Sequence, residues 1–411
     1  MGNNIPQGYK ATALGIIPQE WEVMRLGDIV SITSGESPSL YHLKAEGKYP
    51  YVKVEDLNNC EKYQESSREY SDDNNTTIKA GSIIFPKRGA SILNNKVRIA
   101  AKDIQMDSNM MAITPHTTIV DTEFLYIRIL HERLYRIADT SSIPQINNKH
   151  IIPYKIAVPP LAEQRKIAEV LGVWDEAIEK QARLIEKLAL RKRALMQRLL
   201  SAKLRLPGFS EPWQKVKLGE ICERVTRKNI EDNQNVMTIS AQRGFVAQTD
   251  FFNKSVASET LESYYLVFKD EFCYNKSYSN GYPMGAIKRL SEADKAVVTS
   301  LYICFNVKPE TNTNIDYLSY YFDNGGLNRG LTKIANEGGR AHGLLNVTPK
   351  DFFGLSFEIP SLKEQTAIAE VLIAADREIE LAKEKLERLR RQKRGLMQQL
   401  LSGKKRVKIN I

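Results

Sequence analysis

The sequence predicts an α+β protein with two mixed α/β domains, separated by two long antiparallel coiled-coil helices in a pseudo-two-fold repeat. Two observations lead to this prediction. A long helical phrase occurs twice at a constant offset, and a shorter phrase, "LGDI" in one copy and "LGEI" in the other, lies far upstream of each long one. The 411 residues are enough for two domains plus extra elements.

The long repeat begins with "LAEQRKIAEVL" at 161–171 and returns as "LKEQTAIAEVL" at 362–372. Half of the positions in 164–201 are identical, without a gap, to those in 365–402. Apolar residues recur at alternating steps of four and three in both copies, which indicates a coiled-coil seam. The positions that we expect to serve helix pairing or partner docking are Gln164, Ile167, Leu171, Ile178, Leu188, Leu195, Gln365, Ile368, Leu372, Ile379, Leu389 and Leu396.

Charge is graded along each long helix. The first carries no acidic residue between Glu186 and its predicted end, and the second carries none after Glu387. Acids first and bases last suit the helix macrodipole, and they also allow the two helices to pair antiparallel. Contact of the basic ends with DNA is the alternative interpretation.

The repeats divide the chain into five segments. A first domain is expected over 1–158 with its core at about 20–155, and a first spacer helix over 159–203. A second domain follows over 204–358, then a second spacer helix over 359–403 and a basic tail over 404–411. The Trp-containing phrases "IIPQEWEVMRLGDI" and "LPGFSEPWQKVKLGEI" mark the start of the two domain cores.

The domains contain short β-rich runs, such as "GSIIFPKRG" and "DEFCYN", and helical patterns at 122–138 and 314–331. Their loops combine basic, amide and aromatic residues, which suit contacts to phosphates and base edges. Ordinary solvated turns are the alternative. The candidate DNA-binding residues are Lys87, Arg88, Lys96, Arg98, Tyr274, Asn275, Lys276, Tyr278, Asn280, Lys288 and Arg289.

The net charge of +10 favours a polyanionic partner, although RNA, DNA and ribosomes would all satisfy it. Four scattered cysteines and five dispersed histidines show no metal-ligand spacing, so no metal site is expected. Phosphate-binding loops, nucleophile elbows and methyltransferase motifs are absent from the sequence, so no catalytic residue is expected. No apolar run is long enough to span a membrane, and the N-terminus lacks the pattern of a signal peptide, so we expect a cytoplasmic protein.

The chain resembles the specificity subunits of Type I restriction–modification systems. The resemblance lies in "PPLAEQRKIAEVL" and "IPSLKEQTAIAEVL", each followed by a long helix that ends in "LMQRLLS" or "LMQQLLS". The phrases around "LGDI" and "LGEI", the stretch "SGESPS" at 34–39 and the "YIC" run after Ser300 also fit, so the resemblance covers nearly the whole chain.

The resemblance implies that each domain is a target recognition domain reading one half of a split, asymmetric double-stranded DNA site. The helices would fix the spacer and dock modification subunits, expected to be two. Those subunits would bind S-adenosylmethionine and methylate adenine, and restriction subunits would translocate and cleave DNA with ATP and Mg²⁺. This chain would be non-catalytic and hold no cofactor itself. Two alternatives stay open: a coiled-coil scaffold with two protein-binding domains, and a specificity subunit of a related system that is not Type I.

Overall fold

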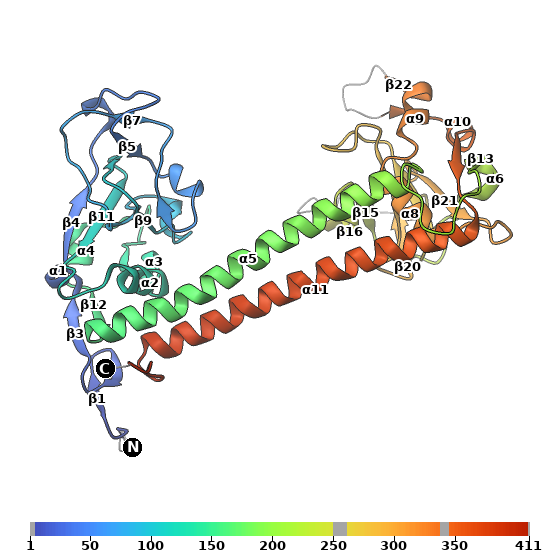
Figure 1. The fold of residues 1–411 in the computed structure, drawn as a ribbon. Helices are drawn as coiled ribbons and strands as arrows, with labels where there is room; N and C mark the ends of the chain where they lie inside the picture. The colour runs from blue at the N-terminus through green and yellow to red at the C-terminus, as the bar shows by residue number, and fades with distance from the viewer. Residues whose placement is uncertain (1–4, 250–260, 338–344, 410–411) are drawn as a thin grey trace. The chain divides into compact units, whose positions relative to one another are not determined.

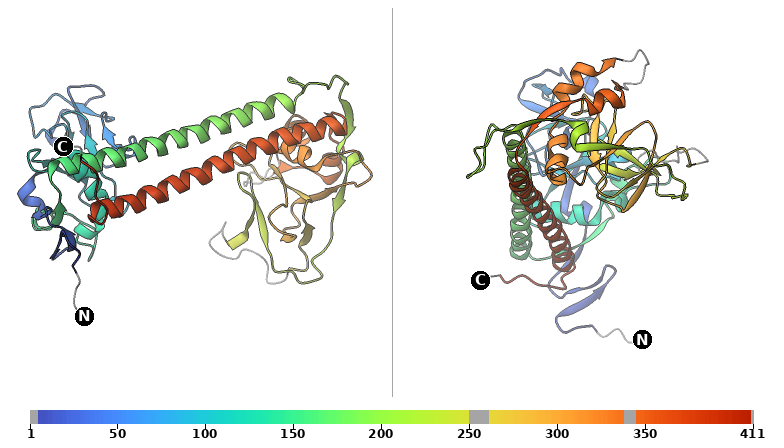
Figure 2. Two further views of the ribbon diagram at one scale, coloured as in Figure 1. Left: turned by 60° about the horizontal axis from the view of Figure 1, so that its bottom comes forward. Right: turned by 90° about the vertical axis from the view of Figure 1, so that its right-hand side faces the viewer.

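The computed structural model describes residues 5–249, 261–337 and 345–409. The chain divides into two compact units. Unit 1 is Met1–Ala182 with Lys385–Ile411, and unit 2 is Arg183–Glu384. Each unit therefore contains one globular part, the first turns of the long helix that follows it, and the last turns of the other long helix. α5 (Leu161–Leu199) and α11 (Leu362–Leu401) are each one uninterrupted helix (Figures 1 and 2).

The globular part of unit 1 is built on a five-stranded sheet in the order β4-β11-β8-β9-β6, with a three-stranded sheet β10-β5-β7 and the pairs β1-β2 and β12-β3. Its strands are β1 Tyr9–Thr12, β2 Gly15–Pro18, β3 Glu22–Arg25, β4 Val30–Ser34, β5 Tyr49–Val52, β6 Tyr63–Gln64, β7 Tyr70–Ser71, β8 Ile83–Pro86, β9 Arg98–Ala100, β10 Gln105–Met106, β11 Met110–Pro115 and β12 Lys155–Val158. Its helices are α1 Leu26–Ile29, α2 Thr122–Glu132, α3 Leu134–Ile137 and α4 Asn148–Ile151, with 3₁₀ turns η1 Pro38–Leu40, η2 Asp56–Asn58 and η3 Ala90–Ile92.

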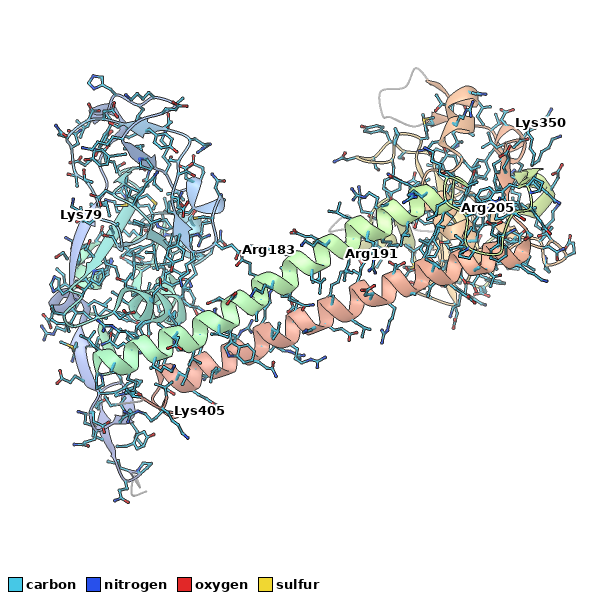
Figure 3. All side chains as sticks on the ribbon, viewed as in Figure 1. Lys79, Arg183, Arg191, Arg205, Lys350 and Lys405 are labelled. Atoms are coloured by element: carbon cyan, nitrogen blue, oxygen red, sulfur yellow. The ribbon has the colours of Figure 1, made fainter. Side chains whose placement is uncertain are left out.

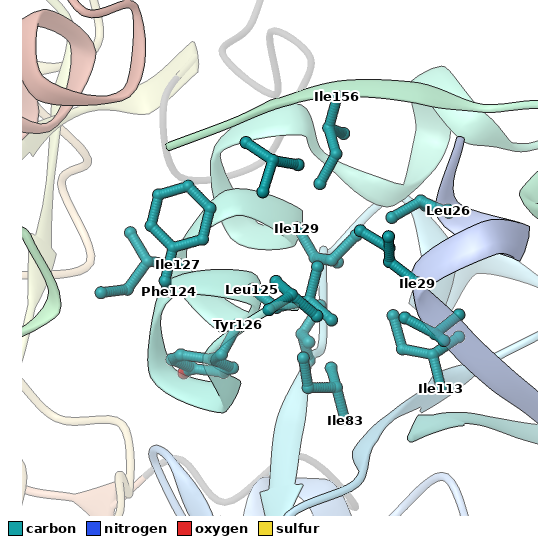
Figure 4. Packing of buried hydrophobic residues seen from close by; sticks show 14 of the residues in the cluster. Leu26, Ile29, Ile83, Ile113, Phe124, Leu125, Tyr126, Ile127, Ile129 and Ile156 are labelled. Carbon is teal, nitrogen blue, oxygen red and sulfur yellow. The ribbon is translucent and has the colours of Figure 1, made fainter. Parts of the chain in front are cut away.

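The core of unit 1 forms where α2 packs on the five-stranded sheet and on α1. Phe124, Ile129, Ile113 and Leu26 are fully or almost fully buried there (Figure 4). The same cluster also includes Leu400 and Leu401 from the end of α11. The predicted helix at 122–138 is broken at Arg133, whose positive φ of 65° ends α2 and starts α3 in a new direction.

Unit 2 repeats this plan with different strands. A four-stranded sheet β14-β21-β18-β19 is accompanied by the pairs β13-β24, β15-β16, β17-β20 and β22-β23. The strands are β13 Gln214–Lys217, β14 Cys222–Val225, β15 Met237–Ser240, β16 Gly244–Ala247, β17 Tyr265–Phe268, β18 Phe272–Asn275, β19 Ala286–Arg289, β20 Lys295–Val298, β21 Ile303–Val307, β22 Asn336–Glu337, β23 Leu345–Asn346 and β24 Ser356–Ile359. The helices are α6 Leu218–Ile221, α8 Ile315–Asp323, α9 Asn328–Ile334 and α10 Pro349–Phe353.

The repeated "LG" pair has a steric reason that is the same in both units. A Cβ on Gly27 would lie 2.9 to 3.1 Å from atoms of Ile152, and a Cβ on Gly219 would lie 3.1 Å from the carbonyl oxygen of Phe353. The short helices α1 and α6 therefore pass so close to the chain ahead of β12 and β24 that a Cβ at either glycine would force its neighbours to shift.

The predicted seam is buried or half-buried along both long helices. In unit 2, Leu188 packs against Ile379, and Lys192, later in α5, pairs with Asp376, earlier in α11. These parts of α5 and α11 therefore run antiparallel. Two half-buried lysines, Lys192 on α5 and Lys393 on α11, are neutralised across the helix pair. Lys192 Nζ lies 2.6 Å from Asp376 Oδ1 in unit 2, and Lys393 pairs in the same way with Asp175 in unit 1.

Each long helix ends in a residue with left-handed backbone, at Ala202 (φ 57°) after α5 and at Gly403 (φ 71°) after α11. The N–H of Leu204 closes the first end by donating to Arg198 O at 3.0 Å, and Lys405 N donates to Gln399 O at 3.2 Å. The left-handed residue lets the chain turn back onto the last carbonyls of the helix, and glycine is preferred at such a position because a Cβ is strained.

We expect Ala202→Gly to raise the free energy of unfolding by roughly 0.5–1 kcal/mol, because relief of the left-handed strain exceeds the added entropy of the unfolded chain. The reciprocal change Gly403→Ala should destabilise, since its Cβ would also meet the ring of Pro18 at 2.3 Å. Urea unfolding of the two variants checks both signs. A loss of stability in Ala202→Gly would contradict the strain argument.

Candidate nucleic-acid interface

A lysine stands at the same point of the fold in both units, directly after a buried strand of the main sheet. Lys87 follows β8 in unit 1, and Lys276 follows β18 in unit 2. Each lysine carbonyl accepts a backbone hydrogen bond from a distant loop, from Ile146 N at 2.9 Å and from Leu345 N at 3.1 Å. Both loops therefore start from an anchored backbone.

Both lysines are half-buried without a carboxylate at ion-pair distance among the described residues. Burial lowers the pKa of Lys276. Burial also lowers the pKa of Lys87, and the neighbouring Arg88 charge lowers it further. A cation that is partly desolvated and unpaired is well suited to bind an anion or the O6 and N7 acceptors of guanine.

The loop after Lys87 presents further polar groups. Arg88 is exposed and its backbone forms a β-bridge with Gln145, so the segment around Gln145 lies beside it. Ile143 in that segment is 72% exposed, which is unusual for a large apolar side chain. Lys96, near the end of the same loop, is half-buried. Sequence reasoning missed the 143–145 segment, because only the backbone pairing reveals its position.

The loop after Lys276 is similar in chemistry. Tyr278 is 65% exposed and Asn280 is exposed. Asn275 is half-buried, and its amide accepts a hydrogen bond from Ser277 N at 3.0 Å and donates one to Ile239 O at 3.4 Å. Gln242, from the turn between β15 and β16, donates to Asn280 O at 3.1 Å. Gln242 is a second polar residue that the sequence did not connect with this loop.

Four of the predicted DNA-binding residues are engaged inside the protein. The Arg98 guanidinium donates to the carbonyls of Leu57, Cys60 and Val97 at 2.7 to 2.8 Å. Tyr274 is fully buried and stacks on Phe352.

Lys288 and Arg289 on β19 are held by carboxylates. Lys288 Nζ lies 2.6 Å from Asp323 Oδ1, and Arg289 Nη1 lies 2.7 Å from Asp316 Oδ1. The contacts of Arg98, Tyr274, Lys288 and Arg289 do not favour a role in reading bases, and their part in DNA binding stays a prediction.

The polar residues of the repeated phrase attach each long helix to its own globular part. Gln164 Oε1 accepts from Asp121 N at 2.7 Å, and its Nε2 donates to Ile119 O at 3.0 Å. Gln365 makes the equivalent contact with Asn314 N at 2.8 Å. Because Asp121 and Asn314 are the N-cap residues of α2 and α8, each glutamine fixes a long helix to the start of a domain helix.

The residues before these glutamines form a second pair of equivalent contacts. The fully buried Glu163 accepts from Arg406 at 2.6 and 2.8 Å and from Trp21 Nε1 at 3.0 Å. In unit 2, the Glu364 carboxylate accepts hydrogen bonds of 2.6 and 2.8 Å from the guanidinium of Arg205, which follows α5 (Figure 3). The expected basic tail is therefore partly structural, since Arg406 neutralises a buried carboxylate.

Within residues 5–249, 261–337 and 345–409, no three His, Cys, Asp or Glu side chains are grouped so that they could hold a metal ion. In the same residues, no helix is both long and apolar enough to cross a membrane.

Comparison with known proteins agrees with this architecture. The chain is 24% identical to the Type I restriction enzyme MjaVIII specificity subunit of Methanocaldococcus jannaschii, over 95% of this chain and 94% of the relative. It is 25% identical to the putative type I restriction enzyme MjaX specificity subunit of that organism, over 98% and 97%. The HsdS subunit from Thermoanaerobacter tengcongensis has the same fold, with a TM-score of 0.53 at 17% identity over 94% of this chain and 98% of that one.

The family described as "Type I restriction modification DNA specificity domain" matches residues 18–189 and again residues 210–391. Each match covers one globular part and most of the long helix that follows it. The chain therefore belongs to the family of Type I restriction–modification DNA specificity subunits.

Proposed function

We propose that this specificity subunit reads an asymmetric two-part DNA site, with the globular part of each unit reading one half. The observation that carries the proposal is a pair of half-buried lysines, Lys87 and Lys276, which stand at equivalent strand ends and have no carboxylate partner in the part of the chain that the structure describes. The loops that follow them differ completely in sequence, as two unequal half-sites require, whereas the long helices are alike.

In unit 1 the proposed reading surface consists of Lys87, Arg88, Lys96 and the neighbouring segment 143–145. In unit 2 it consists of Asn275, Lys276, Tyr278, Asn280 and Gln242. Arginine and lysine suit guanine, amide side chains suit adenine, and an exposed isoleucine or tyrosine suits a thymine methyl group or a sugar. The fold supplies the rigid sheet from which these loops project.

We assign residues 1–158 and 204–358 to the two target recognition domains. The spacer helices are then 159–203 and 359–403, followed by the tail 404–411. α5 has 39 residues, which corresponds to a rod of roughly 58 Å. A helix pair of this length is suited to hold two reading domains at a defined separation.

Specificity subunits of this family are non-catalytic and carry no cofactor. We propose that the catalytic steps occur on partner subunits. Two modification subunits would use S-adenosylmethionine to methylate adenine, and restriction subunits would use ATP and Mg²⁺ to translocate and cleave DNA. We place the complex in the cytoplasm, where chromosomal and incoming DNA meet. Docking of the modification subunits would use the outer faces of the long helices, because Gln164, Ile167, Gln365 and Ile368 are buried in the chain itself.

Selection of bound duplexes from a random pool tests the proposal. The full chain, alone and with its modification subunits, is expected to select two short conserved blocks at a fixed spacing. Lys87→Ala should weaken selection of one block and Lys276→Ala that of the other, each by about 1–3 kcal/mol. Arg224→Ala, an exposed residue on β14, serves as the control. Selection of no sequence at all would favour the protein-binding scaffold instead.

The affinity for DNA should also decrease as the pH rises. The pKa values of Lys87 and Lys276 are lowered in the free protein, and a bound anion raises them. At a pH above the lowered values, each lysine that has lost its proton must therefore take one up when DNA binds. Affinity is therefore expected to fall as pH rises towards the ordinary lysine range. Lys87→Arg should remove part of this dependence, because arginine stays charged. An affinity independent of pH would exclude these lysines as DNA ligands.

A further inference from the structure

Unit 1 contains a basic cleft that the proposed reading surface does not include. Its volume is about 710 Å³, and its walls come from three elements: the loop after η3, the junction of α2 with α3, and a late turn of α11. The polar residues that line it include Asn94, His131, Arg133, Arg136, Arg394 and Gln398.

The cations of this cleft have no acidic counterpart. None of the lining residues is acidic, and no carboxylate lies at ion-pair distance from Arg133, Arg136 or Arg394 among the described residues. All three arginines are exposed. Burial and the surrounding arginines lower the pKa of His131, and its Nδ1 has no hydrogen-bond partner within the described part of the chain. Gathering like charges costs free energy, so the cleft is complementary to an anion.

The local backbone directs Arg133 outward. Its φ of 65° is uncommon for a residue other than glycine. The amide of Asn95 holds the break from both sides, since Nδ2 donates to Leu130 O at 3.0 Å and Oδ1 accepts from Leu134 N at 2.9 Å. The strained conformation is therefore built into the contact between the loop and the helix junction.

Helix dipoles alone do not explain the cluster. They account for His131 in the last turn of α2 and Arg136 in the last turn of α3. Arg394, however, lies about two turns before the end of α11 at Leu401, beyond the range of the effect. A dipole on each helix also gives no reason for cations of three elements to share one cleft.

We propose that this cleft binds backbone phosphates of the DNA duplex next to the half-site read by unit 1. The inference rests on the proposed function. Charge and continuity support it, because the loop that begins at Lys87 on the reading surface reaches the cleft at Leu93–Asn95. Arginine and amide side chains are the usual phosphate ligands in protein–DNA complexes.

The corresponding corner of unit 2 differs. Counted from the N-caps of α2 and α8, Asn324 and Gly326 stand where unit 1 has His131 and Arg133. A cleft of about 580 Å³ lies at the end of α8, and Lys215, Arg329 and Lys333 line it together with the carboxylate of Glu358. Because Glu358 offsets part of that positive charge, we draw the inference for the cleft of unit 1.

The test is the salt dependence of DNA binding by the full chain. In the triple variant Arg133→Gln, Arg136→Gln, Arg394→Gln, the slope of log Kobs against log salt should shrink by about one for each arginine. The selected duplex and a scrambled duplex of equal length should lose affinity by the same factor, because phosphate contacts carry no sequence information. Arg193→Gln, at the repeat position equivalent to Arg394 on α5, is the control and should leave the slope unchanged.

An unchanged slope in the triple variant overturns the inference. It is equally overturned if base preference in the unit 1 half-site is lost, which would make the cleft a reading surface, or if only binding of a modification subunit is weakened. A failure of the proposed function is distinguishable, since the wild-type chain would then show a salt slope without preferring any sequence. If circular dichroism shows that the triple variant is less folded, the single variant Arg394→Gln, at an exposed residue, tests the inference instead. Its slope is expected to decrease by about one.

Discussion

Replacing Arg406 with alanine is expected to lower the free energy of unfolding by about 2–4 kcal/mol. The change removes both guanidinium hydrogen bonds from Glu163, a carboxylate with no exposed surface. Breaking a fully buried ion pair costs roughly 3–5 kcal/mol because one charge stays desolvated and unpaired. The lower estimate reflects the 36% exposure of the arginine side chain, which lets water solvate part of the pair. Urea unfolding followed by tryptophan fluorescence measures the loss.

Neighbouring and equivalent residues provide the controls. Lys405→Ala, one position earlier and exposed (Figure 3), should change the stability by less than about 0.5 kcal/mol. Arg205→Ala should reproduce the large loss in unit 2, because Glu364 is also buried. Adding Glu163→Gln to Arg406→Ala should restore part of the stability, since a neutral amide can still accept from Trp21. Equal effects of Arg406→Ala and Lys405→Ala would contradict a structural role for the tail.

Exchanging residues 20–155 for the corresponding domain of another specificity subunit is expected to change one half of the DNA site and leave the other half and the spacing intact. Each mismatched base pair costs about 1–3 kcal/mol, roughly additively. Losing a whole half-site should therefore lower affinity for the original DNA by about 1,000-fold or more. The reverse exchange of residues 212–355 should change only the other half.

The graft must keep the contacts that attach the domain to the long helices. Trp21 donates to Glu163, and Arg128 Nη1 donates to Leu401 O at 2.7 Å, so both residues should be retained in the exchanged segment. Selection from a random duplex pool shows which half-site has changed. If both half-sites change together, the two domains do not read independently.

Much of the fold could be predicted because the chain contains two copies of the same sequence pattern. The constant spacing between the two helical phrases predicted α5 and α11, and the heptad pattern predicted which side chains are buried. The break at Arg133 could not be predicted. The helical pattern continues through it, and the break is held by hydrogen bonds from Asn95, which is far away in the sequence.

The candidate site was harder to predict, because the type of a side chain does not indicate its direction. Lys87 directly follows β8 and Arg98 begins β9, yet Arg98 is satisfied by three carbonyls, whereas Lys87 has no carboxylate at ion-pair distance among the described residues. Similarly, Glu163 and Arg406 are 243 residues apart, and no local pattern links them. The repeat could have provided the signal, since Glu364 and Arg205 stand at the equivalent positions.

The composition of unit 1 has a consequence for synthesis on the ribosome. Its core includes Leu400 and Leu401, and its buried carboxylate Glu163 is neutralised by Arg406, so the last of these residues is synthesised 243 residues after Glu163. The first domain to emerge is thus the last to be completed, whereas unit 2 is contiguous in sequence and can close earlier. A chain that terminates prematurely before α11 would expose the apolar surface of unit 1, a feature that proteases and chaperones recognise.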